Sequence, residues 1–270
     1  MEQFLTSLPD GFLDALVNEL DTPDVIGITL GGSYVRGEAT PYSDVDLACF
    51  LHEQNPLPPR RYLYRSGYLL SIAFITVADI RQRLSQLPDA LLFVAGQRQV
   101  LLDKDSSVKE LLQAIASFNW ASLEQHARGY VSFQVAMLAE QAHKILSVWS
   151  QNNHLALSYA TTKLLLALTE VMTVRYGVLI KNDSSYYQQV QEAVGLTSPW
   201  TAFHQLVTGA QTQAPMKEQA KQVLHLYQET VKLAKPVMQQ SHLAVAEQAV
   251  QIIDDALLTL RTNTSADPIP

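Results

Sequence analysis

The chain has 270 residues, of which 47% are hydrophobic and 17% are charged, with a formal net charge of -7 and a sequence pI near 5.5. This length is enough for two domains with substantial cores. The acidic balance argues against nonspecific nucleic-acid binding, which usually needs a basic face. Cys49 is the single cysteine, so an intramolecular disulfide and a multi-cysteine zinc site are both excluded.

The first part of the chain, residues 1–117, alternates between helix and strand patterns. Apolar residues recur at helical spacing from Phe4 to Leu20 and predict a helix packed on a sheet. Short apolar, β-branched runs then predict strands at 25–30, 44–51 and 68–75.

The segment between the first two strands contains a glycine turn followed by two aspartates. Gly31 and Gly32 can adopt positive φ and let a ligand approach the backbone, and Ser33 can cap the short helix that follows. Exposed N–H groups at such a helix start attract phosphate. Asp44 and Asp46 begin the next strand, where residues at i and i+2 point the same way, so their carboxylates repel unless a cation lies between them. Mg²⁺ with phosphate ligands fits this pattern, which indicates phosphoryl or nucleotidyl transfer.

This segment resembles the Gly-Ser…Asp-x-Asp motif of the DNA polymerase β nucleotidyltransferase superfamily, in particular its small bacterial branch that includes the aminoglycoside nucleotidyltransferases. The resemblance implies an α/β (α+β) domain with a mixed sheet. Gly32 and Ser33 would hold the nucleoside triphosphate, Arg36 would support the loop or contact phosphate, and Asp44 and Asp46 would bind the metals. The likeness extends more loosely to a strand at 98–105 and a helix from about Ser107.

The sequence departs from the superfamily at one position. Members commonly place a third carboxylate on a later strand, here best matched by residues 68–75, and Ser71 or Ala73 occupies the expected place. This absence leaves open a catalytically reduced, nucleotide-binding protein. Asp79 lies just beyond and is better explained as the start of a helix.

From about Trp120 onward the pattern is helical throughout. We expect helices at 120–150, 154–178, 184–195, 199–210, 215–237 and 240–262, with Pro236 kinking or ending the fifth. The short connections favour an all-α helical bundle domain at 118–262, followed by a flexible tail at 263–270. No apolar stretch is long and uninterrupted enough to span a bilayer, and no leader pattern is present, so we expect a cytoplasmic protein.

Several polar residues of the helical half are candidates for the site. Glu170 could take a proton from an acceptor hydroxyl, or could lie on a solvated face that it shares with Lys163; Glu140 is an alternative base. Arg175 and Lys181 lie near the C-terminal end of the helix expected at 154–178, where cations stabilise a helix. Alternatively, they could reach the triphosphate across a cleft. The basic run 60–65 is either a solvated hairpin or a contact for nucleotide or acceptor.

The leading hypothesis is a magnesium-dependent nucleotidyltransferase that moves AMP from ATP to a hydroxyl of a small acceptor, which only the resemblance makes aminoglycoside-like. Two alternatives remain: an antitoxin-like nucleotidyltransferase that acts on a protein partner, and a nonenzymatic nucleotide-binding module. The candidate residues are catalytic Asp44, Asp46 and Glu170, of which the two aspartates bind metal, and nucleotide-binding Gly32, Ser33, Arg36 and Lys181.

Overall fold

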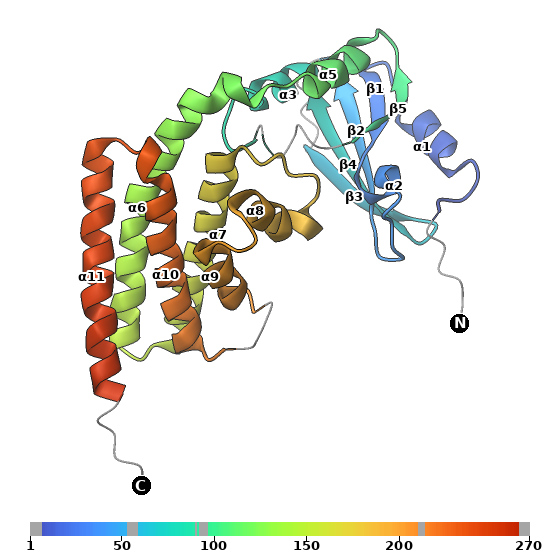
Figure 1. Cartoon of the computed structure of the whole chain (residues 1–270). Coiled ribbons are helices and arrows are strands. Elements are labelled where there is room, and N and C mark those ends of the chain that lie inside the picture. Colours follow the sequence, from blue (N-terminus) through green and yellow to red (C-terminus); the bar gives the residue numbers. More distant parts are fainter. Residues whose placement is uncertain (1–6, 53–58, 90, 92–96, 210–213, 265–270) are drawn as a thin grey trace. The chain divides into compact units, whose positions relative to one another are not determined.

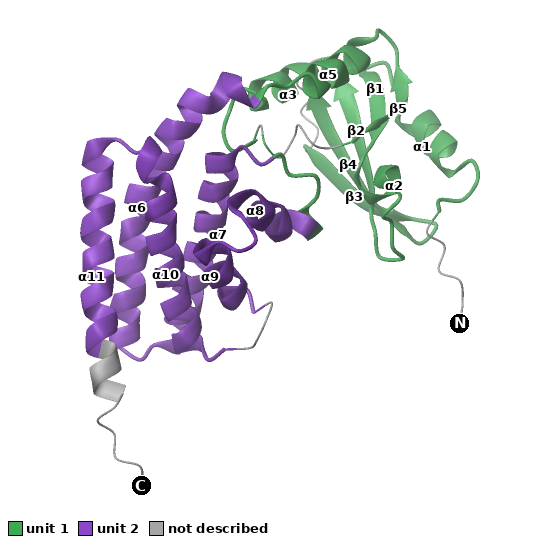
Figure 2. Cartoon of the chain, viewed as in Figure 1, with its two compact units in different colours: residues 1–119, 179–184 green, residues 120–178, 185–270 purple. Residues whose placement is uncertain are grey.

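The computed structural model of the chain describes residues 7–52, 59–89, 91, 97–209 and 214–264, with side chains up to residue 259 (Figure 1). The chain forms two compact units (Figure 2). The first unit comprises Met1–Asn119 and Leu179–Ser184, and the second comprises Trp120–Val178 and Ser185–Pro270. The division expected from the sequence placed the segment 179–184 in the helical part instead.

The first unit contains a five-stranded mixed sheet with the strand order β3-β4-β2-β1-β5. The strands are β1 Val25–Leu30, β2 Val45–Leu51, β3 Arg60–Arg65, β4 Tyr68–Thr76 and β5 Gln99–Asp103. The pair β2–β4 is parallel and the other three pairs are antiparallel. The predicted strands and the mixed sheet are therefore confirmed, and residues 60–65 form a hairpin with β4.

Helices cover both faces of this sheet. On one face α1 (Phe12–Leu20) packs Phe12 and Leu16 against sheet residues that include Ile28. On the other face α3 (Val77–Arg83) and α5 (Ser107–Ala116) pack Ile80 and Leu111 against the sheet (Figure 1). The short helix α2 (Gly32–Arg36) connects β1 to β2. The sequence predicted the helix α1 from Phe4, but it begins at Phe12, and residues 4–6 of the expected helix lie outside the described residues.

Local sequence signals account for several of these boundaries. At the start of α3 the Thr76 Oγ1 accepts the Asp79 N–H at 3.0 Å, and the Asp79 Oδ2 accepts the Thr76 N–H at 3.1 Å. This reciprocal capping box confirms the helix-start interpretation of Asp79. In β1, a Cβ on Gly27 would lie 2.5 Å from the Val108 side chain, so only glycine lets α5 approach the strand this closely.

The second unit is helical throughout its described residues. Its elements are η1 Trp120–Leu123, α6 Glu124–Ser150, α7 His154–Tyr176, α8 Tyr186–Val194, α9 Pro199–Val207, α10 Met216–Ala234, η3 Lys235–Val237 and α11 Gln240–Thr264, while η2 (Asp183–Ser185) joins the two units in the chain. The predicted helical order is confirmed, and α10 ends just before Pro236. α11 continues to Thr264, and the rest of the expected tail lies outside the described residues.

Caps place the helix ends where the sequence predicted turns. The Asn153 Oδ1 accepts the Ala156 N–H at the start of α7, and the Ser198 Oγ accepts the Thr201 N–H at the start of α9, both at 3.1 Å. Gly177 ends α7 with φ +61, a left-handed conformation that favours glycine.

By length and composition, α7 could cross a bilayer, contrary to the expectation from the sequence. Half of its most apolar window is buried, and the helix packs against α6 and α10 within the second unit. The two observations fit a core helix. A helix that is buried on several sides is apolar around most of its surface, as a membrane-spanning helix is.

A polar network is buried between α7, α8 and α9. His204 is fully buried, and its ring nitrogens contact the Thr169 Oγ1 at 3.0 Å and the Gln191 Nε2 at 2.8 Å. Its ring also stacks on Trp200 at 4.8 Å between centroids. Burial lowers the pKa of His204 to about 4, so the ring is neutral in the folded unit at neutral pH.

We expect this buried histidine to make the second unit acid-sensitive. The unfolded chain takes up a proton near pH 6.5, whereas the folded chain does so only near pH 4, so the free energy of unfolding falls as the pH drops through this interval. The loss amounts to roughly 3 kcal/mol at most, from about 1.4 kcal/mol per pKa unit. Urea titrations between pH 4 and 8 measure it.

The variant His204→Gln provides the comparison, because glutamine keeps hydrogen-bonding groups and does not titrate. The difference between the wild-type and variant unfolding free energies should shrink as the pH falls from 6.5 to 4. Parallel curves over this range would show that His204 does not carry the effect.

Candidate active site

One cavity of about 530 Å³ in the first unit brings most of the predicted site residues together. Among the residues that line it are Gly32, Ser33, Arg36, Asp44, Asp46, Arg60, Ser71, Arg98 and Lys181. We call it the carboxylate cavity. Six of the seven residues predicted from the sequence are in this set, and Glu170 is in the second unit.

The glycine turn lies directly against β2. The Gly31 N–H donates to the Asp46 carbonyl at 2.8 Å, and Gly32 has φ +71. A Cβ on Gly32 would lie 2.3 Å from the Asp46 Oδ2. Because α2 begins at Gly32, Ser33 lies inside the helix, and the prediction that Ser33 caps it is wrong. The N-cap of α2 is Gly31, which directly follows the end of β1 at Leu30.

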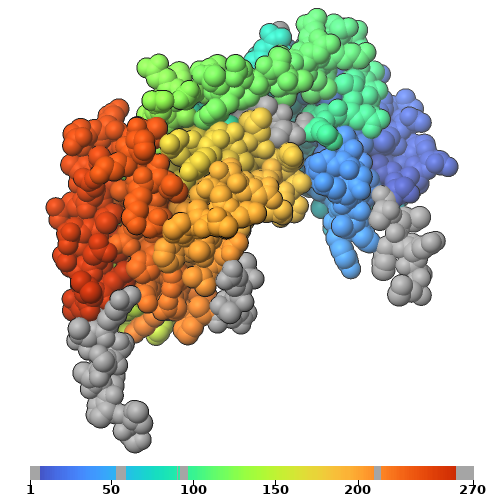
Figure 3. Space-filling model, viewed as in Figure 1, coloured from blue at the N-terminus to red at the C-terminus, as the bar shows by residue number. Residues whose placement is uncertain are grey.

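Asp44 lies just before β2, at the end of a segment ordered by its own turn. The Thr40 N–H donates to the Ser43 Oγ at 2.9 Å, and the Ser43 N–H donates to the Thr40 carbonyl at 3.0 Å. This segment, in blue, protrudes from the first unit in the space-filling view (Figure 3), and its Tyr42 is 93% exposed. The position of Asp44 therefore depends on local hydrogen bonds as well as on the sheet.

The two carboxylates share one electrostatic environment. Burial, and then the neighbouring charge of Asp44, raise the pKa of Asp46, while a hydrogen bond from Ser71 and the charges of Arg98 and Arg60 act in the opposite direction. A divalent cation would relieve the repulsion between the carboxylates. Their oxygens, with water and phosphate oxygens, form the ligand set that Mg²⁺ prefers, so the residues fit the metal that the fold family implies. Among the described residues no group of three or more His, Cys, Asp or Glu side chains could hold a metal.

Ser71 lies on the strand beside Asp46, where the resemblance to the superfamily implies a third carboxylate. In the parallel β2–β4 pair, Asp46 is in register with Ser71 and Ala48 with Ala73, so Ser71 is the residue beside Asp46. The side chain of Ser71 is buried and contributes a neutral hydroxyl. Of the two residues that the sequence offers for this place, Ser71 and Ala73, only Ser71 is in register with Asp46.

Arg98 is a cavity residue that the sequence did not indicate as part of the site. Its Nη1 donates to the Thr29 Oγ1 at 3.3 Å and lies 3.3 Å from the place of a Cβ on Gly31. Burial lowers the pKa of Arg98, Arg60 acts in the same direction, and Asp46 opposes them. The available signal in the sequence was a single arginine directly before an apolar strand. This signal does not indicate on which face of the sheet the side chain lies or which residues it contacts.

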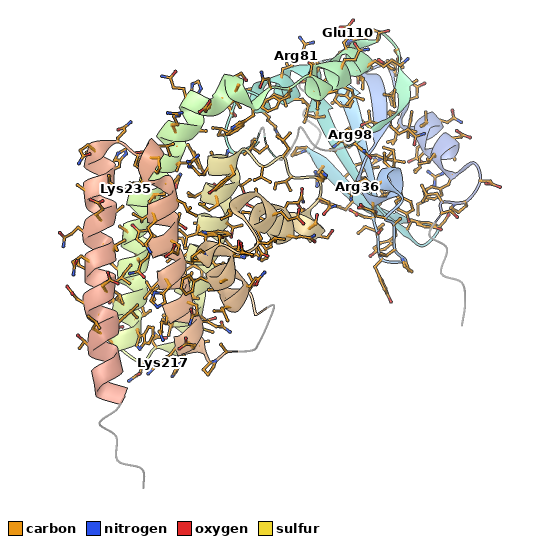
Figure 4. The ribbon with its side chains drawn as sticks, in the orientation of Figure 1. Arg36, Arg81, Arg98, Glu110, Lys217 and Lys235 are labelled. Carbon is orange, nitrogen blue, oxygen red and sulfur yellow. The ribbon has the colours of Figure 1, made fainter. Side chains whose placement is uncertain are left out.

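The two cations predicted from the sequence, Arg36 and Lys181, line the same cavity. The Arg36 Nε lies 2.7 Å from the Glu38 Oε2, an ion pair that fixes the direction of the guanidinium. Figure 4 labels Arg36 and Arg98 on the first unit. Lys181 belongs to the segment Leu179–Ser184, which is part of the same unit, and the Ile180 N–H anchors this segment by donating to the Leu91 carbonyl at 3.0 Å. Lys181 therefore reaches the cavity as part of the first unit.

The other candidates lie in the second unit. Glu170 is partly buried in α7 and accepts a hydrogen bond from the Tyr130 hydroxyl. Burial and then Glu170 raise the pKa of Tyr130. Glu140 is exposed and pairs with Lys144 on α6 at 2.6 Å. The Arg175 Nε donates to the Leu233 carbonyl at 3.3 Å.

A mixed sheet that presents a glycine turn and an aspartate pair in one cavity defines a class of nucleotide-transferring enzymes. Residues 13–112 match the family described as the nucleotidyltransferase domain, in agreement with the resemblance to the polymerase β superfamily.

Comparisons with known proteins gave two further matches. A "putative protein adenylyltransferase" of Methanocaldococcus jannaschii is 28% identical over 127 residues, which cover 42% of this chain and 82% of that protein. A crystal structure of a nucleotidyltransferase-like protein from Exiguobacterium sibiricum matches with a TM-score of 0.46 and 12% identity, over 93% of this chain and 90% of that one.

We expect Gly32→Ala to impair the site more than its backbone strain alone would. An added Cβ would displace the Asp46 carboxylate, in addition to the cost of about 1 kcal/mol for a positive φ. Manganese titration, followed by the paramagnetic effect on water relaxation, should show weaker binding to the variant.

Gly37→Ala is the matched control, because Gly37 has the same φ of +71 and a Cβ there would meet nothing within 4 Å. The control should lose similar stability and keep wild-type manganese affinity. Equal affinities of the two variants would rule out the contact between position 32 and Asp46 as a determinant of the site.

Proposed function

We propose that this chain transfers a nucleoside monophosphate, with ATP as the donor, to a hydroxyl of an acceptor and releases pyrophosphate. The observation that carries the proposal is the single cavity in which the glycine turn, both aspartates and the cations Arg36, Arg98 and Lys181 meet. The relative named as an adenylyltransferase supports ATP as the donor.

In the proposed reaction the acceptor oxygen attacks the α-phosphorus of ATP. A new phosphorus–oxygen bond forms, and the bond from the α-phosphorus to the bridging oxygen breaks, so that pyrophosphate leaves with the electron pair. Arg36 and Lys181 would contact the departing phosphates, and the backbone at Gly32 would admit them because no side chain intervenes. Asp44 and Asp46 would hold Mg²⁺, which when bound neutralises charge on the reacting phosphates.

The acceptor distinguishes two versions of this function. The sequence resemblance favours a small hydroxyl-bearing acceptor of the aminoglycoside type. The name of the archaeal relative favours a hydroxyl on a protein partner. Ser71 beside Asp46 favours a third possibility, nucleotide binding with reduced catalysis, because it removes one expected metal ligand.

Asp46→Asn should reduce nucleotide transfer at least tenfold, since even indirect partners of a metal ligand are typically worth 10- to 100-fold. Transfer is measured with α-labelled ATP, Mg²⁺ and a panel of aminoglycosides, other hydroxyl compounds and copurifying proteins. Asp14→Asn, an exposed change on α1, is the control and should leave the rate unaltered.

Wild-type turnover by the Asp46 variant would exclude this carboxylate from the mechanism. ATP binding by the wild-type chain without transfer to any member of the panel would favour the nucleotide-binding alternative. The labelled product identifies the acceptor class, because a small molecule and a protein are separated by filtration.

Glu170 remains the proposed general base, and Glu170→Gln tests it. Removing a general base typically lowers the rate 100- to 10,000-fold, and glutamine can still accept the hydrogen bond from Tyr130. Glu140→Gln, the rival assignment, breaks only an exposed ion pair with Lys144 and should have little effect. A retained rate for Glu170→Gln would reject its role, and a loss confined to Glu140→Gln would transfer that role to Glu140.

A further inference from the structure

A second cavity, of about 430 Å³, adjoins the carboxylate cavity within the first unit. Arg60, Ala73 and Arg98 line both cavities. The floor and walls of the second are mainly apolar and include Ala48, Phe50 and Leu112. We call it the apolar cavity, and it lies on the face of the sheet that α3 and α5 cover.

The strand register explains why this cavity begins beside the aspartate pair. Along β2 and β4 the pair Asp46–Ser71 is followed, two residues on, by the pair Ala48–Ala73. Side chains two residues apart point to the same face, so the two alanines continue the surface that carries Asp46. The side chains of Ala48 and Ala73 are single methyl groups, so they leave open space above the two strands that larger side chains would fill.

The positive charges where the two cavities meet favour a ligand that carries a polyanionic group in the carboxylate cavity and extends into the apolar cavity. Arg60 and Arg98 lie where the two cavities meet, and the carboxylate cavity also contains Arg36 and Lys181. A guanidinium can pair with phosphate and can stack on an aromatic ring. A ligand with phosphates on one side of these arginines and a flat apolar ring on the other would satisfy both cavities.

We infer that the apolar cavity binds the purine base of the nucleoside triphosphate whose phosphates occupy the carboxylate cavity. This inference rests on the proposed function and deepens it, because it assigns the recognition of the donor to Ala48, Ala73 and the shared arginines. The base would lie on the two alanines, and the ribose and α-phosphate would pass between Arg60 and Arg98.

Filling the cavity tests the inference by separating the base from the phosphates. Ala48→Leu and Leu112→Trp change residues that line only the apolar cavity, and Ala78→Leu, exposed on α3, is the matched control. Calorimetry with Mg²⁺ compares ATP with inorganic tripolyphosphate on the full chain. Loss of a stacked contact to a base typically costs about 1–3 kcal/mol where the base stacks on an aromatic side chain, so we expect ATP affinity to fall at least roughly fivefold in both variants, while tripolyphosphate affinity stays unaltered.

The outcomes distinguish this inference from the function on which it rests. If folded cavity variants bind ATP as tightly as the wild type, the base does not occupy the cavity. If the wild-type chain binds tripolyphosphate and ATP equally, the inference fails and the phosphate site stands. If it binds neither, the proposed function itself fails.

Photolabelling of the wild-type chain with 8-azido-ATP gives a readout that does not depend on folded variants. Label on peptides that contain residues 48–50, 73–75 or 111–115 supports the assignment. Label confined to other peptides overturns it.

Discussion

The close approach of the Gly32 backbone to the Asp46 carboxylate is the constraint on which the site depends. A single added carbon at position 32 would lie 2.3 Å from the Asp46 Oδ2, and the adjacent Gly31 N–H holds the backbone of β2. Asp46 belongs to β2, which lies between β1 and β4 in the sheet. Core clusters pack on both faces of these strands and hold β2 in place. The sheet core therefore fixes one side of the cavity, and the absence of side chains in the turn lets an anionic ligand approach the other.

The acids of the cavity are not grouped around Asp46 by a third strand carboxylate, because Ser71 supplies a hydroxyl there. Asp44, Asp46 and Asp183 line the cavity together with four cations: Arg36, Arg60, Arg98 and Lys181. Such a cavity suits a triphosphate, whose charge requires both a metal and fixed cations. Partial burial makes the charge of Arg98 more effective than that of an exposed side chain, since less water screens it.

In the proposed reaction, the register of one parallel strand pair would connect the residues of the chemical step with the surface proposed for the base of the donor. Successive inward-facing pairs along β2 and β4 carry an aspartate beside a serine and then two alanines. The first pair belongs to the proposed chemistry at the α-phosphate, and the second would form the surface for the base. In this proposal the distance between the reacting phosphate and the base would be set by the repeat distance along the strands, which does not change when the surrounding loops vary.

The sequence by itself determined the element order, the all-helical second half and the pairing of Asp44 with Asp46, because periodicity, helix caps and strand alternation act over a few residues. The mixed sheet followed from the family resemblance. Asn153, Ser198 and Asp79 act at helix starts as their types predict. Only the tertiary structure decided that Ser71 stands beside Asp46, that Arg98 reaches the cavity, and that the segment with Lys181 joins the first unit. These relations join residues far apart in the chain, so they follow from sheet register and packing, which no local pattern encodes.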